Sequence, residues 1–128
     1  MLPVLTSLVS ESVSSIVEGS YEGKPTKLVY GVFTTPENAI GGNAICAFRI
    51  EDILETFEGP FKEQETANSH WLPVRDMKVP NPRPGKCSQD STKQPESSLR
   101  FIQDHSIMDK AVPAFFGASP LYIRANIE

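Results

Sequence analysis

Cysteine is scarce in this sequence, whose 128 residues include only Cys46 and Cys87. Two cysteines are too few for a disulfide scaffold or a cysteine-rich zinc site, and they are compatible with one disulfide or with partners that lie elsewhere. The sequence also lacks the run of roughly 18 apolar residues that a membrane-spanning helix needs. Its mildly apolar start has no basic region. We therefore expect neither a signal peptide nor a transmembrane segment within this chain.

Positive charge is also in short supply. The 12 Lys and Arg residues face 16 Asp and Glu residues, and the net charge of −4 argues against a surface dedicated to nucleic acid or to anionic membranes. Residues 51–65 hold six acidic residues and one lysine, whereas residues 75–86 hold four basic residues and one aspartate. This polarity predicts either the attraction of a partner or second copy, or loops whose charges are simply solvated.

Proline and glycine are plentiful, with 11 and 8 residues, and so many helix breakers exclude an all-α fold. Apolar and β-branched runs predict strands over 27–35 and 44–50, paired as an antiparallel hairpin with a long connection. An apolar residue at every third or fourth position predicts a helix over 51–58. A serine cap predicts a second helix over 98–110, and a last strand is expected over 120–126.

Two segments carry no such pattern. Residues 1–20 predict at most a short strand. Residues 60–96 show no sustained period, and their alternating prolines force an extended path. An irregular run of this length indicates either a functional insertion or a wrong assignment of elements. Trp71, the one tryptophan of the chain, is predicted either to anchor this insertion in a core or to form an interface hot spot.

Metal-binding and nucleophilic constellations are weak. Four side chains can be considered as metal ligands: His70, His105, Cys46 and Cys87. Their spacing repeats no zinc pattern. A hydrolase would combine Cys46 or a serine with His105 and with Asp104 or Asp109. The sequence has no G-x-S-x-G motif, however, and Cys46 lies in an apolar run where thiols are usually inert.

Paired carboxylates could perform acid–base chemistry. They occur at Glu51, Asp52 and Glu55, and again at Glu63 and Glu65. A solvated helix face accounts for them as well, because acidic residues stabilise the first turn of a helix. We therefore predict no catalytic residue, no metal site, no cofactor and no small-molecule substrate.

Six motifs are together similar to the Sema domain of semaphorins, in the order and spacing of that family from about Ile16 to Arg124. The motifs are LVYGVFTT at 28–35, AICAF at 44–48, FEGPFKEQ at 57–64, WLPV at 71–74, PRPGKC at 82–87 and FIQDHSIMD at 101–109. FKEQ at 61–64 with AFF at 114–116 most resembles the invertebrate transmembrane semaphorins of the first class.

The resemblance implies an all-β fold that is a fragment of a seven-bladed β-propeller, with a helical insertion called the extrusion. It assigns residues 16–128 to a partial Sema domain, made of strands of one blade plus the extrusion, and leaves residues 1–15 as an unmatched lead-in. It also implies a non-enzymatic, extracellular or plasma-membrane protein. Such proteins are homodimers and act as ligands of plexin-type receptors in axon guidance.

The chain departs from the family at its cysteines. The family partners of Cys46 and Cys87 are upstream cysteines that are absent here, so the resemblance predicts two unpaired thiols. The glycosylation sequon that often follows the second cysteine is missing too, since no Asn-x-Ser/Thr occurs. We therefore expect a truncated guidance ligand, and the alternative is an inactive truncated interaction module without receptor binding.

Overall fold

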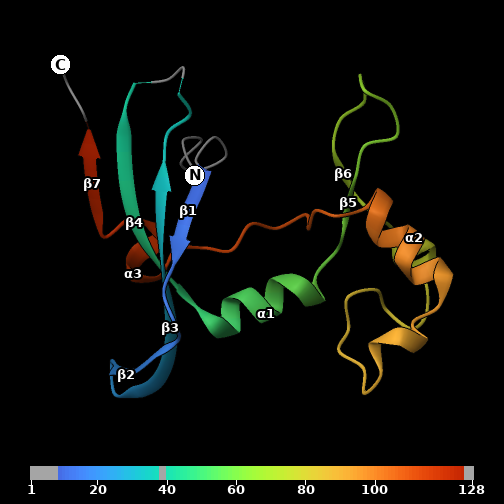
Figure 1. The fold of residues 1–128 in the computed structure, drawn as a ribbon, viewed down its shortest axis with the longest axis horizontal. Helices are drawn as coiled ribbons and strands as arrows, with labels where there is room; N and C mark the ends of the chain where they lie inside the picture. Colours follow the sequence, from blue (N-terminus) through green and yellow to red (C-terminus); the bar gives the residue numbers. More distant parts are fainter. Residues whose placement is uncertain (1–8, 38–39, 126–128) are drawn as a thin grey trace. The chain divides into compact units, whose positions relative to one another are not determined.

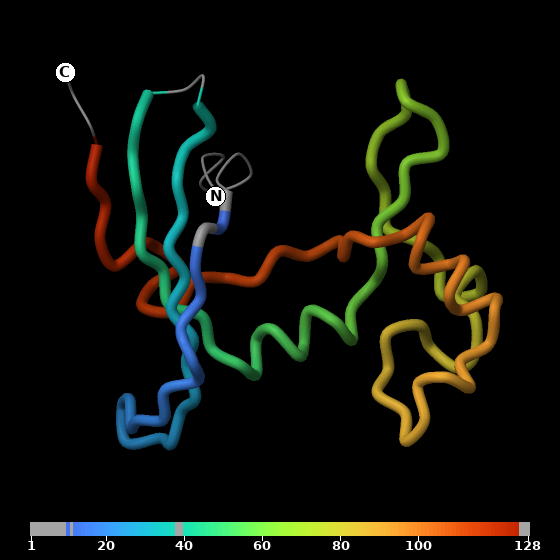
Figure 2. The backbone as a smooth tube through the Cα atoms, in the orientation of Figure 1, coloured from blue at the N-terminus to red at the C-terminus, as the bar shows by residue number. Residues whose placement is uncertain are grey.

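The computed structural model describes residues 9–37 and 40–125 (Figure 1). The chain divides into two compact units. Unit 1 is formed by residues up to 53 and from 112 onward, and unit 2 by residues 54–111. The backbone leaves unit 1 after the strand β4 (Gly42–Arg49), forms unit 2, and returns to add the strand β7 (Tyr122–Ala125) to the sheet of unit 1 (Figure 2). Unit 2 is thus an insertion in the sequence of unit 1.

Unit 1 contains one antiparallel sheet of five strands. These are β1 (Val9–Val13), β2 (Val17–Tyr21), β3 (Lys24–Thr34), β4 (Gly42–Arg49) and β7 (Tyr122–Ala125). The main path runs β1-β3-β4-β7, and β2 pairs with the first half of β3. The predicted hairpin of β3 and β4 is confirmed, because all seven residue pairs between them are antiparallel.

The two central strands form because their side chains are apolar and β-branched. Leu28 and Cys46 are completely buried, and the rings of Phe33 and Phe48 meet edge to face with centroids 5.9 Å apart. Gly31 lies under the Phe33 ring, and a Cβ at this position would come within 2.9 Å of it. This glycine is therefore required by the close approach of an aromatic neighbour.

The strands β1 and β2 correct the expectation of at most a short strand in residues 1–20, of which residues 1–8 lie outside the described part. The described side chains of both strands are mostly exposed, so the sequence here lacks the alternation of apolar and polar residues from which strands could be predicted. The turn that joins β2 to β3 consists of Glu22 and Gly23, both with positive φ (53° and 75°). Such a two-residue turn matches the twist of a hairpin, and Gly23 was its mark in the sequence.

The helix α1 (Ile50–Glu58) confirms the prediction over 51–58. It ends where expected, since the N–H of Gly59 donates to the carbonyl of Thr56 at 3.1 Å. Its apolar stripe is only partly covered, because Leu54 and Phe57 remain 59% and 62% exposed. A short helix, α3 (Phe115–Ala118), precedes β7 and contains residues with positive φ.

Unit 2 combines short strands with helices. Its elements are β5 (Lys62–Glu63), β6 (Leu72–Pro73), the 3-10 turns η2 (Asp76–Lys78) and η3 (Ser91–Lys93), and the helix α2 (Glu96–Asp104). Much of 60–96 is irregular, as the sequence predicted. Since helices α1 and α2 accompany the strands, the chain is mainly β with some helices. In the described ranges, no helix is long and apolar enough to cross a membrane.

The predicted helix over 98–110 is wrong at both ends. Helix α2 begins at Glu96, so Ser98 lies inside it and donates its hydroxyl to the carbonyl of Pro82 at 3.1 Å instead of capping it. The helix stops at Asp104 because the following residues pair with a different segment. The N–H of Lys62 donates to Ile107, and the N–H of Asp109 donates to Pro60.

The core of unit 2 is small and aromatic. Phe61, Val74 and Phe101 are buried, and Val79 and Met108 pack against them. The rings of Phe61 and Phe101 meet edge to face at 5.0 Å. The long irregular segment is therefore held by a few large side chains rather than by a sheet.

Candidate interaction surface

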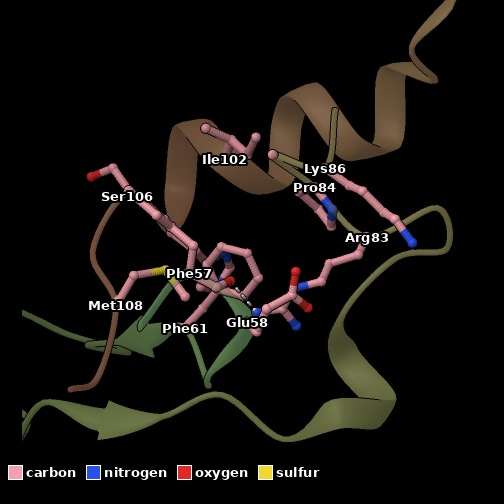
Figure 3. A pocket seen from close by; sticks show the side chains of 11 residues that line it. Phe57, Glu58, Phe61, Arg83, Pro84, Lys86, Ile102, Ser106 and Met108 are labelled. Carbon is pink, nitrogen blue, oxygen red and sulfur yellow. Dashed lines mark hydrogen bonds between the residues drawn. The ribbon is translucent and has the colours of Figure 1, made fainter. Parts of the chain in front are cut away.

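A pocket of about 260 Å³ opens in unit 2 beside this aromatic core (Figure 3). Phe57, Phe61, Ile102 and Met108 give it an apolar wall, and Arg83, Lys86, Glu58 and His105 contribute polar groups. The mixture of large apolar side chains and a few charges is typical of surfaces that bind other molecules.

Arg83 is the best-fixed charged side chain of the pocket. Its guanidinium lies 4.8 Å from the centroid of the Phe61 ring and donates to the carbonyl of Phe57 at 3.0 Å and to that of Gly59. These carbonyls belong to the end of α1, where helix carbonyls lack intrahelical partners. Arg83 thus has two roles: it caps the C-terminal end of α1, and it covers the Phe61 ring of the aromatic core.

A turn sets Arg83 and Lys86 side by side. The N–H of Lys86 donates to the carbonyl of Arg83 at 3.3 Å, with Pro84 and Gly85 between them and a φ of 81° at Gly85. Proline followed by a glycine of positive φ is the signature of a type II turn. The hydroxyl of Ser98, which is 1% exposed, fixes this turn to α2 through the carbonyl of Pro82.

A second charged group joins β5, η2 and the end of α2. Glu63 accepts from Lys78 Nζ at 3.0 Å, and its other oxygen lies 3.4 Å from Nε2 of His105. The hydrogen bond from Lys78 lowers the pKa of the Glu63 carboxyl, and His105 adds to this effect. The His105 ring stacks on Phe101 at 4.2 Å. The group ties the hairpin of unit 2 to its helix.

The metal candidates do not assemble within the described residues, where no group of three metal-ligating side chains occurs. Cys46 and Cys87 are both free thiols, the first buried and the second exposed. Burial raises the pKa of the Cys46 thiol, which makes it a poor nucleophile. Cys46 belongs to unit 1, whereas His105 belongs to unit 2.

The carboxylates of the sequence are bound or solvated. Asp52 accepts from Arg49 at 2.6 Å, Glu51 lies 3.9 Å from the same side chain, and Glu55 and Glu65 are exposed. Of the hydrolase candidates, Asp104 is exposed at the end of α2, and Asp109 is half-buried where its backbone pairs with Pro60.

Trp71 is 48% exposed and lies outside the buried cluster of unit 2. The aromatic anchors of the insertion are therefore Phe61 and Phe101. The contact of Arg83 with Phe61 was not predicted, because it joins residues 22 positions apart. The one signal in the local sequence is the Pro84-Gly85 pair, which favours a turn.

Comparison with known proteins identifies the family. A family model described as the Sema domain matches residues 11–128. The chain is 56% identical over 118 residues to Semaphorin-1A of Schistocerca americana and 53% identical over 116 residues to Semaphorin-1A of Drosophila melanogaster. These matches cover 92% and 91% of this chain, but only 16% and 13% of the two relatives.

Solved structures agree with this result. The chain superimposes on Drosophila Semaphorin 1a, extracellular domains 1-2, with a TM-score of 0.73 at 52% identity, covering 92% of this chain and 23% of that one. A structure of Drosophila Plexin A in complex with Semaphorin 1b matches with a TM-score of 0.75 at 44% identity, covering 92% and 22%. The chain belongs to the semaphorins, a non-enzymatic signalling family, and corresponds to part of their Sema domain.

Proposed function

We propose that this chain is part of an extracellular or membrane-bound semaphorin that acts as a ligand of a plexin-type receptor in axon guidance. The observation that carries the proposal is the 44% identity, over 92% of this chain, to the structure of Semaphorin 1b with Plexin A. Because the chain spans 16% of its curated relative, the activity belongs to the longer protein rather than to these residues alone.

The sheet of unit 1 supports a propeller for that longer protein. Its main path has the strand order β1-β3-β4-β7, and four antiparallel strands make one propeller blade. The apolar side chains of Val13, Ile16, Tyr122 and Ile123 are more than half exposed, which suits a sheet that neighbouring blades cover. Unit 2 then corresponds to the extrusion, inserted between the third and fourth strands of the blade.

Receptor binding is expected to require the complete propeller. A stable protein–protein interface covers about 800 Å² on each partner and needs a rigid, preformed surface. We propose that the longer protein is a homodimer, as the family resemblance implies. An interaction module without receptor binding is the alternative function for residues 1–128 by themselves.

A chimera tests the proposal. In the Semaphorin 1b ectodomain, the segment that matches residues 11–128 is replaced by this chain, and binding to immobilised Plexin A is measured with unmodified Semaphorin 1b as the control. The chimera should bind, and residues 1–128 alone should not. A chimera that folds but does not bind would contradict the receptor assignment. Equal affinity of the isolated chain would contradict the need for a propeller.

A further inference from the structure

Strand β7 is attached to the sheet of unit 1 by few contacts. It lies at the outer edge beside β4, which is its pairing partner among the described strands (Figure 1). The pairing comprises four residue pairs, from Gly42–Ala125 to Ile45–Tyr122, and all four side chains of β7 are exposed. Removing β7 from this edge therefore breaks main-chain hydrogen bonds but uncovers no buried side chain of β7 itself.

The turn that leads into β7 has an unfavourable backbone conformation. Phe116, Gly117 and Ala118 have consecutive positive φ angles of 61°, 80° and 58°. Glycine adopts this left-handed conformation freely, whereas residues with a Cβ are penalised there. The Phe116 ring meets the rings of Phe115 and Tyr21 at centroid distances of 4.6 Å and 5.5 Å. These ring contacts retain the turn against a backbone penalty.

The same turn can be extended, and β7 then reaches a second molecule. Residues 116–121 span at most about 20 Å when extended, which exceeds the roughly 10 Å between two packed sheets. The β4 edge of a second copy offers β7 the same hydrogen-bonding groups in the same register, because the two chains are identical. Every residue pair lost within one molecule is thus regained between two, and the penalised turn is released in both.

Exposed apolar side chains favour association of two copies. Leu121, Tyr122 and Ile123 are consecutive and are 46%, 56% and 68% exposed. In an exchanged pair this segment lies between two molecules, where these side chains can be covered. The apolar surface removed from water then offsets the freedom that two molecules lose when they associate.

We propose that two copies of this chain associate by exchanging strand β7, with residues 116–118 as the hinge. Each β7 pairs with β4 of the other copy in the register that it has within one molecule. Reciprocal exchange of an identical element gives a closed dimer with two-fold symmetry. The exchange belongs to unit 1 of this chain, and it is separate from the homodimer and the receptor binding proposed above for the longer protein.

A disulfide across β4 and β7 tests the exchange in the full chain. Asn43→Cys with Arg124→Cys, combined with Cys87→Ser, places thiols on paired residues, whose Cα atoms in an antiparallel sheet lie within disulfide range. The chain is equilibrated over a concentration series and oxidised. Size-exclusion chromatography with light scattering then gives the mass, and non-reducing electrophoresis locates the cross-link. The single variants Asn43→Cys and Arg124→Cys, each with Cys87→Ser, control for random collision.

Cross-links within one molecule are expected at low concentration, and cross-links between two molecules are expected in the dimer. The single variants should give few of the latter. A dimer cross-linked only within each molecule would show that uncut edges pair without exchange, and it would overturn the proposal. The absence of any dimer up to about 1 mM would overturn it as well.

Hinge variants test the direction of the effect. Ala118→Gly removes a backbone penalty from the closed turn, so the Kd of the dimer should rise at least about tenfold. Ala118→Val places a β-branched side chain at positive φ, and the Kd should fall. Ala111→Gly and Ala111→Val, at an exposed residue outside the hinge, should leave the Kd within about twofold. Equal changes at the two positions would overturn the proposal, and neither result bears on the receptor.

Discussion

At the scale of single residues, the two thiols differ in their access to solvent, which governs how fast a thiol reacts. Cys46 is completely buried in β4, and burial raises the pKa of its thiol, whereas Cys87 is exposed. The thiolate is the reactive form, and reaction at a buried group must wait for local opening. Alkylation followed by mass measurement should therefore modify Cys87 at least about tenfold faster than Cys46, with the difference lost in denaturant. Equal native rates, or a Cys46–Cys87 disulfide in freshly folded material, would contradict this prediction.

The interactions of the Glu63 carboxylate lead us to expect that the free energy of unfolding falls at acid pH. Its carboxyl has a pKa lowered first by Lys78 and then by His105, so the ionised form is favoured in the folded state. Its contribution is fully present above the ordinary glutamate pKa of about 4.3 and is lost as the pH falls through the lower folded-state value. Urea unfolding should show Glu63→Gln as destabilised at about pH 7 and equal to the original chain at about pH 2. Glu65→Gln, at an exposed residue, is the control and should change stability at neither pH. A deficit of Glu63→Gln that is independent of pH would contradict the assignment.

At the scale of elements, the sequence predicted those whose own side chains are buried. The strands β3 and β4 are apolar in sequence, and Leu28 and Cys46 within them are completely buried. Their antiparallel pairing could be predicted from these two neighbouring apolar runs. The strands β1 and β2 were missed because their described side chains are mostly exposed, and their pairing depends on the long strand β3. The end of α2 was missed because distant segments determine it: residues 107–109 pair with residues 60–62.

The candidate pocket was missed for the same reason. Its residues belong to separate sequence motifs, and the contact of Arg83 with Phe61 follows from no local pattern. The unpaired thiols could be predicted from the family resemblance. The burial of Cys46 could be predicted from its apolar neighbours alone. The sequence predicted an extended path through the alternating prolines, and the turn at Pro84-Gly85 was not predicted. The position of Arg83 beside that turn depends on the folded unit.

The β2–β3 turn offers a test of this reasoning at the same scale. Glu22 has a φ of 53°, a left-handed conformation that costs most residues about 1–2 kcal/mol and that asparagine adopts more readily. Glu22→Asn should therefore raise the free energy of unfolding by about 0.5 kcal/mol. Glu22→Gln removes the same charge without this backbone preference, and it should leave stability unchanged. Denaturant midpoints measure both variants, and an equal gain in the two would show that charge rather than backbone strain is relieved.

At the scale of the whole molecule, the two units differ in how completely they bury their apolar side chains. Unit 2 encloses a small aromatic cluster, with Phe61 and Phe101 at its centre, within an otherwise irregular chain. Unit 1 has regular strands, but many of its apolar side chains, such as Val13 and Tyr122, stay more than half exposed. This exposure agrees with the proposal that neighbouring sheets cover unit 1 in a longer protein, of which the chain spans about the 16% that it covers in its relative.

The exposed edge of that sheet predicts how the isolated chain behaves. Strand β7 ends the strand order, and its Ile123 is 68% exposed. Exposed apolar edge strands pair with other molecules, and a charge placed on them prevents this. The isolated chain should therefore aggregate as its concentration rises, and Ile123→Lys should slow the aggregation several-fold in light-scattering measurements. Ile40→Lys makes the same chemical change at a residue that is 81% exposed and lies outside the strands, so it should have little effect. Equal slowing by both variants would assign the effect to net charge, and a soluble, sharply melting monomer at all concentrations would show that the sheet needs no neighbours.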